Sequence, residues 1–293
     1  MGGHRDDRHS FYSRPVFDER NDEQAANSWL TMVHGFSQNC EYFDRQVAEF
    51  ASSYRVFTPN LLGHGARDRR AAEYAVSGYA LDILEQFDER GVADTHVWGS
   101  HTGAAVALWL AVHHPKRIRS LILEAPVVPG RPMPMVAARL DRARATAISD
   151  GPLVAMEDWF DNAEFFESIR RDPVRRRAGE HRAMVLRFPG HPLVASPPPD
   201  PAPSLVDDLA AIACPVLAYV GADDIDDFRT TATWLTAQLA QAVDVVLPGA
   251  GGFPAWEDPD QTNRLVVAFL ESVDGLPSSR APRHPSAKRM ETR

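Results

Sequence analysis

The stretch Gly99-Ser100-His101-Thr102-Gly103 stands where two different sequence patterns meet. Residues 95–98 before it read Thr-His-Val-Trp, a short run typical of a buried strand, and residues 104–113 after it follow an alanine-rich helical pattern. Glycines on both sides of three residues suit a sharp turn, because glycine tolerates backbone conformations and close approaches that other residues do not. The stretch therefore predicts a tight turn from a strand into a helix, with a histidine at its centre.

Apolar runs and helical stretches alternate on both sides of this turn. Such alternation predicts stacked βαβ units and a mostly parallel sheet flanked by helices, which is the α/β fold class. The expected strands cover residues 29–33, 55–59, 95–98, 118–124, 216–220 and 243–247. The expected helices around them cover residues 42–52, 77–90, 104–113 and 260–273.

A different kind of segment separates the fourth strand from the fifth. Strand-like runs disappear there, and helical stretches with charged residues alternate with proline-rich breaks. We interpret the segment as an inserted helical cap over the sheet, in which Trp159 either lines a pocket or packs the cap onto itself. The predicted division is an N-terminal segment 1–28, a first core part 29–126, the cap 127–205, a second core part 206–274 and a disordered tail 275–293.

Composition narrows the class of partner. The net charge is −9 and the isoelectric point about 5.6, which argues against a nucleic-acid surface. The two cysteines give neither a disulfide framework nor a metal-ligand spacing. The first 14 residues lack the apolar core of a secretory signal, and no run reaches the roughly 20 apolar residues of a membrane span. We therefore expect a cytoplasmic protein that binds a small molecule and not a membrane; the sequence does not predict its oligomeric state.

Five motifs in a fixed order resemble the landmarks of the α/β-hydrolase superfamily. The central one is the Gly99–Gly103 stretch, which has the spacing of the family's nucleophile elbow. The others, in chain order, are Val33-His34-Gly35-Phe36, the loop from Pro59 to Gly65, the run from Cys214 to Asp224 and the turn from Pro248 to Pro254. The resemblance covers residues 29–273 and implies an α/β-hydrolase fold with the helical cap as its insertion.

The resemblance also implies the role of each position, and the chain departs from the pattern at two of them. His101 stands in place of the nucleophile, and Gly252 stands where the family has its catalytic histidine. The acid would be Asp224 or, at the end of the fourth strand, Glu124. The oxyanion would be held by the backbone amides of Phe36 and Thr102. The other implied site residues are the elbow residues Gly99, Ser100 and Gly103 and the pocket residues His34, Ser37, Trp159, Gly252 and Phe253.

Three interpretations of these departures stay open. In the first, His101 and a carboxylate form a rebuilt site, where the imidazole is a general base or a nucleophile towards a small ester or carbonyl compound. In the second, Ser100 keeps serine chemistry, or His181 or His191 replaces the missing base. In the third, catalysis is lost and the pocket only binds a ligand. The same oxyanion site also suits lyase or cofactor-free oxygenase chemistry. No metal site, cofactor or dinucleotide motif is predicted.

Overall fold

A single parallel sheet forms the centre of the molecule. The computed structural model describes residues 28–67, 74–195 and 203–275, so the predicted N-terminal segment (apart from residue 28) and tail (apart from residue 275) lie outside the described residues. The sheet has six strands in the order β2-β1-β3-β4-β5-β6, and all neighbouring strands are parallel. The strands are β1 (Trp29–Val33), β2 (Arg55–Phe57), β3 (Thr95–Ser100), β4 (Ile118–Glu124), β5 (Val216–Gly221) and β6 (Ala242–Leu247).

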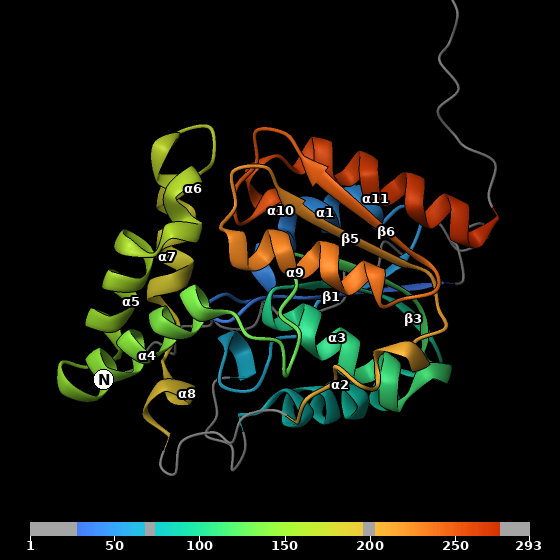
Figure 1. The fold of residues 1–293 in the computed structure, drawn as a ribbon, viewed down its shortest axis with the longest axis horizontal. Coiled ribbons are helices and arrows are strands. Elements are labelled where there is room, and N and C mark those ends of the chain that lie inside the picture. The colour runs from blue at the N-terminus through green and yellow to red at the C-terminus, as the bar shows by residue number, and fades with distance from the viewer. Residues whose placement is uncertain (1–27, 68–73, 196–202, 276–293) are drawn as a thin grey trace, which may run out of the picture.

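Helices cover both faces of the sheet, which is why its central strands are buried along most or all of their length. Every residue of β1, β3 and β5 is buried, as expected for a parallel sheet covered on two sides. Figure 1 shows α1 (Asp44–Phe50) and α11 (Pro259–Asp274) on one side and α2 (Val76–Arg90) and α3 (Thr102–His113) on the other. The predicted α/β fold class, with a mostly parallel sheet flanked by helices, is confirmed.

One helix of the second core part has no counterpart among the predicted elements. Helix α9 (Asp226–Ala237) connects β5 to β6 and buries Phe228, Thr231, Ala232 and Leu235. These residues have the spacing of one helical face, so the signal was present in the sequence. The short helix α10 (Pro254–Glu257) follows β6 and leads into α11.

The segment between β4 and β5 is helical. Figure 1 shows its helices gathered at one side of the molecule, next to the sheet and its covering helices. They are α4 (Pro134–Ser149), α5 (Pro152–Asn162), the short 3₁₀ turn η4 (Glu164–Phe166), α6 (Glu167–Arg171), α7 (Ala178–Leu186) and α8 (His191–Val194). The division at residues 127 and 205, and the cap role of this segment, stay predictions. None of the described helices is long and apolar enough to cross a membrane.

The strand directions decide where a site can form. Because all strands are parallel, the loops that follow β1, β3, β4, β5 and β6 lie at one edge of the sheet. Register brings the predicted residues together there: Val33 is paired with Gly99, and Ser100 with Glu124. The predicted site residues other than Trp159, which comes from α5, therefore belong to or adjoin one sheet edge.

Candidate active site

The turn between β3 and α3 holds His101 in a strained conformation. Its backbone has φ 50° and ψ −106°, in the region that glycine tolerates best. Gly99 and Gly103 make this turn possible, because the chain passes too closely for side chains at either position. A Cβ on Gly99 would overlap the backbone of Gly103, and a Cβ on Gly103 would overlap the carbonyl oxygen of Val33. The turn is thus built as tightly as the spacing of its glycines predicts.

The His101 ring is buried and keeps one nitrogen free. Its Nδ1 shares a hydrogen bond of 2.9 Å with the Ser100 hydroxyl, and its Nε2 has no hydrogen-bond partner among the described residues. The rings of Phe228 and Phe253 pack against the imidazole, each with its centroid 4.7 Å away. Burial lowers the pKa of His101 to about 3, because the apolar surroundings disfavour the charged form. His101 is therefore neutral at physiological pH.

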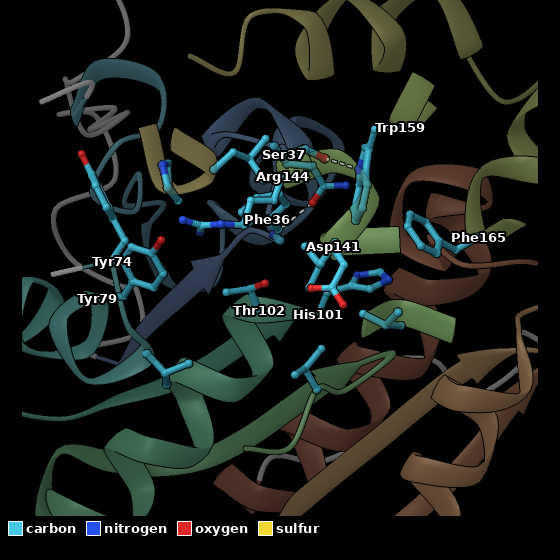
Figure 2. Close-up of a pocket in the computed structure, with 18 of the residues that line it drawn as sticks. Phe36, Ser37, Tyr74, Tyr79, His101, Thr102, Asp141, Arg144, Trp159 and Phe165 are labelled. Atoms are coloured by element: carbon cyan, nitrogen blue, oxygen red, sulfur yellow. Dashed lines mark hydrogen bonds between the residues drawn. The ribbon is translucent and has the colours of Figure 1, made fainter. Parts of the chain in front are cut away.

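A cavity of about 370 Å³ opens in front of His101. Its wall combines the turn after β1, the start of α3 and side chains from α4, α5 and α9, as Figure 2 shows in part. Of the predicted site residues, those on the wall are Phe36, Ser37, His101, Thr102, Trp159 and Phe253. Those behind it are His34, Gly99, Ser100, Gly103, Glu124, Asp224 and Gly252. The wall is mostly apolar, as is usual for small-molecule sites.

Two backbone amides on the cavity wall have no acceptor among the described residues. They belong to Phe36, in the turn after β1, and Thr102, the first residue of α3. Thr102 lacks an acceptor because the first amides of a helix have no partner within it. The turn is fixed from behind, since Gln38 Oε1 accepts a hydrogen bond of 3.0 Å from the Gly35 amide. These amides are the two that the family resemblance assigns to the oxyanion.

Glu124 lies beneath the turn rather than beside the imidazole. Its carboxylate accepts hydrogen bonds from the Tyr42 hydroxyl (2.9 Å) and the Ala255 amide (2.7 Å). Burial raises the pKa of Glu124 to about 7, against the opposing effect of these bonds and of a hydrogen bond from Ser100. The main chain also connects the two predicted site residues, because the His101 amide donates to the Glu124 carbonyl oxygen (2.9 Å).

Asp224 does not bind the imidazole either. One carboxyl oxygen accepts from the Ile225 amide (2.7 Å), and the other has no partner among the described residues. Burial raises the pKa of Asp224 well above its usual range, so the acid is favoured in its neutral form. Neither predicted acid is hydrogen-bonded to the His101 ring; the Ser100 hydroxyl is.

Gly252, the position that the resemblance assigns to the family's histidine, is packed against the helical segment. A Cβ on Gly252 would lie 2.5 Å from the carbonyl oxygen of Phe165, in η4. The turn around Gly252 is held by Glu257, which accepts hydrogen bonds from the amides of Gly251 (2.8 Å) and Phe253 (3.0 Å). Main-chain packing therefore leaves no room for a side chain at position 252.

The other histidines have separate roles. His34 donates from Nδ1 to the Gly35 carbonyl (2.8 Å) and accepts at Nε2 from the Leu61 amide (3.1 Å), so both ring nitrogens are used within the fold. His181 is buried and is not among the residues that line the cavity. Its Nε2 accepts a hydrogen bond of 3.1 Å from the side-chain nitrogen Nε2 of Gln38. His191 begins α8 and is not among the cavity residues.

Sequence reasoning missed several cavity residues, above all Phe228, Asp141 and Arg144. The helical periodicity of α9 would have singled out Phe228, whereas no local pattern distinguishes Arg144 from the other arginines of α4. No group of three or more His, Cys, Asp or Glu residues within the described ranges is arranged to hold a metal ion.

Comparison with known proteins gives matches along most of the chain. A family model for the alpha/beta hydrolase family matches residues 32–265. The chain is 26% identical to a pimeloyl-[acyl-carrier protein] methyl ester esterase of Nitrosomonas europaea, across 84% of this chain and 94% of that protein. It is 34% identical to Lipase 3 of Moraxella sp. (strain TA144), but across only 32% of this chain and 30% of that one.

Solved structures give the same picture of the fold. The structure of MenH from S. aureus superposes with a TM-score of 0.74 at 22% identity, covering 86% of this chain and 96% of that one. A hydrolase from Pseudomonas aeruginosa gives a TM-score of 0.73 at 25% identity, covering 84% and 92%. These likenesses confirm the predicted fold.

Proposed function

Because this chain belongs to the alpha/beta hydrolase family, we propose that it is an enzyme acting on a small ester or another carbonyl compound, with His101 in place of a serine. The observation that carries the proposal is that His101 lines the cavity and has a buried Nε2 with no partner among the described residues. Phe36 and Thr102 line the same cavity, and their backbone amides have no acceptor among those residues either. A carbonyl group in this cavity would meet a basic nitrogen and two hydrogen-bond donors together.

The amides of Phe36 and Thr102 supply the electrostatic part of the mechanism. As a nucleophile adds to the carbonyl carbon, negative charge develops on the oxygen, and two fixed donors in a dry cavity stabilise that charge more than water does. Since these donors belong to the backbone, the histidine at position 101 does not alter them. The same pair would hold the enolate of a lyase reaction.

His101 supplies the chemical part. Its neutral imidazole has a lone pair on Nε2, which either removes a proton from an attacking water or attacks the carbonyl carbon itself. In the second case the bond to the ester's alcohol breaks, the alkoxide leaves and takes a proton from water, and an acyl-imidazole remains for water to hydrolyse. In both steps the ring becomes positively charged. A pKa of about 3 makes the imidazole a weak base in the empty cavity, and the negative oxygen formed beside it would favour its charged form.

Ser100 and Glu124 orient this imidazole. The two residues are paired across β3 and β4, so their side chains leave the sheet on the same face. With Glu124 ionised, the Ser100 hydroxyl donates to the carboxylate and accepts from His101 Nδ1–H, at 2.9 Å. These two hydrogen bonds would place the proton on Nδ1 and leave the lone pair on Nε2. We assign Ser100 and Glu124 as positioning residues, since neither lines the cavity.

The test is turnover of activated short-chain esters by the wild-type protein and by His101→Ala. We expect the substitution to lower kcat/KM by about 10²- to 10⁴-fold, the usual contribution of a positioned acid–base group. His113→Ala is the matched control, because His113 lies on the same helix but is exposed. Circular dichroism checks that both variants fold. Mass spectrometry of quenched reactions separates a nucleophile, which leaves an acyl group on His101, from a base, which does not.

One observation favours a second function, the binding of a ligand without turnover. No carboxylate of the described residues is hydrogen-bonded to the His101 ring, and the neutral imidazole is a good hydrogen-bond partner for a bound molecule. Equal turnover by wild type and His101→Ala would remove His101 from the mechanism. Absence of turnover in the wild type, with esters and then with lyase substrates, would favour the binding protein.

A further inference from the structure

Two charged side chains belong to the wall of a cavity whose other described lining residues are uncharged. Asp141 and Arg144 lie about one helical turn apart on α4 (Figure 2). Among the described residues that line the cavity, they and the neutral His101 are the acidic and basic side chains, apart from the tyrosines. Asp141 is exposed, whereas Arg144 is half-buried. Charged groups in a mostly apolar cavity need a partner, because burial of an unpaired charge is unfavourable.

The arginines of α4 differ in how they are paired. Arg139 forms two hydrogen bonds with Glu164, at 2.8 and 2.6 Å, and Arg142 forms two with Asp158, at 2.7 and 2.8 Å. Both pairs are bidentate, with two parallel hydrogen bonds between the guanidinium and the carboxylate. Arg144 has no ion pair with any described carboxylate, although Asp141 is on the same helix. The arginine that enters the cavity is thus the one without an anionic partner.

Arg144 is also held in place. One of its terminal nitrogens donates to the carbonyl oxygen of Ala195, the residue that follows α8, at 3.1 Å. This bond uses one of the five donors of the guanidinium, so a pair of donors remains for a planar anion. Its partner in this bond is a neutral carbonyl oxygen, and no carboxylate among the described residues is paired with its charge.

We propose that Arg144 binds a carboxylate of the substrate. The substrate class is then a short ester or carbonyl compound with an apolar chain and a carboxylate at the end away from the reacting carbonyl. A single guanidinium with Asp141 next to it matches one negative charge better than the two of a phosphate monoester. This inference rests on the proposed function, since it assigns the reacting end to His101.

The test compares monomethyl adipate, which carries a carboxylate, with methyl hexanoate, which does not. We expect the wild-type protein to prefer the carboxylate ester in kcat/KM by about 10- to 100-fold, the usual effect of a charge-assisted hydrogen bond. Arg144→Met, which keeps the bulk and removes the charge, should bring this ratio close to one. Arg142→Met is the matched control on the same helix, and its ratio should equal that of the wild type.

Binding separates this inference from the proposed function. If the wild type hydrolyses neither ester, both compounds are titrated calorimetrically into the wild type and the two variants. A preference for monomethyl adipate that disappears only in Arg144→Met would support the carboxylate site while the proposed ester hydrolysis fails. Equal ratios in the wild type and Arg144→Met, or binding of monomethyl adipate that is absent or independent of Arg144, would overturn the inference.

Discussion

The two sides of the site, one at β1 and β3 and the other at β5 and β6, differ in the groups that form them. On the side of β1 and β3, the functional groups are backbone amides and a turn whose shape is set by Gly99 and Gly103. On the side of β5 and β6, the family's functional groups are side chains, and here Asp224 is turned to a neighbouring amide while Gly252 packs under Phe165. The first side presents residues with unpaired backbone amides to the cavity, and on the second Gly252 belongs to the packing between the sheet and the helical segment.

This difference indicates that side-chain groups of such a site are more easily lost by substitution than its backbone donors. A backbone donor persists as long as the turn persists, because it does not depend on the identity of a side chain. A side-chain base is lost with one substitution, and the space that it leaves is then open to its neighbours. Beside the turn around Gly252, at Gly251, a buried junction connects the sheet to the helical segment: Ser168 donates to Glu257 at 2.7 Å, and Arg176 forms a buried ion pair with Glu257.

The largest effect on stability should come from breaking this junction. Glu257→Gln would leave the buried Arg176 without an ionised partner, and we expect the free energy of unfolding to fall by about 3–5 kcal/mol. Urea denaturation measures the change. The control is Glu164→Gln, which breaks the more exposed pair with Arg139 and should cost at most about 1 kcal/mol. Equal losses in the two variants would mean that the junction contributes no more than a surface pair.

A smaller effect is expected where the missing base would stand. Gly252→Ala places a Cβ 2.5 Å from the Phe165 carbonyl oxygen, and such overpacking destabilises by about 1–3 kcal/mol. Gly179→Ala is the control, since a Cβ there meets nothing within 4 Å and alanine in a helix is favoured by about 0.5–1 kcal/mol. Thermal unfolding compares the two. A Gly252→Ala protein as stable as the wild type would show that η4 shifts at little cost and that position 252 can accept a side chain.

The smallest effect is expected on kcat/KM, from changes in the hydrogen bonds that connect Glu124 to His101 through Ser100. Burial raises the pKa of Glu124 to about 7, so its carboxylate is mostly protonated below that pH and ionised above it. The proposed orientation of His101 requires the ionised form, and kcat/KM should therefore rise as the pH increases through about 7. Ser100→Ala should lower kcat/KM by about tenfold, the effect of one hydrogen bond, and flatten the rise.

Glu124→Gln checks the origin of this pH dependence. His101 itself does not titrate in this range, because burial lowers its pKa to about 3. A rise near pH 7 that persists in Glu124→Gln would assign it to another group and remove Glu124 from the orientation of His101. Nitrogen NMR of the imidazole gives a readout independent of activity, since the proton should lie on Nδ1 in the wild type.

Much of the fold could be predicted from local patterns. The strand at residues 29–33 and the strand at 118–124 agree with β1 and β4 residue by residue, because fully buried strands leave continuous apolar runs. The turn at Gly99–Gly103 was predictable as well, since only glycine permits its close contacts. Helix α9 was missed, although its buried face repeats with helical spacing.

The candidate site was less predictable, because its contacts connect distant parts of the chain. The family resemblance suggested that Asp224 or Glu124 would orient His101, but the hydrogen bond to the ring comes from Ser100, the preceding residue. Phe165 lies 87 positions before Gly252 in the sequence, and only the folded chain brings the two together. The position of Arg144 in the cavity likewise depends on how α4 packs, which no motif in the sequence encodes.

The contact between Phe165 and Gly252 also limits how the site could be changed. Changing position 101 to serine and position 252 to histidine together would not recover an ordinary triad, since the new imidazole would have to displace main chain rather than a side chain. The 163–166 segment would have to be rebuilt first, and no single substitution does that. The packing of main chain against Gly252 therefore opposes the formation of an ordinary triad at these positions.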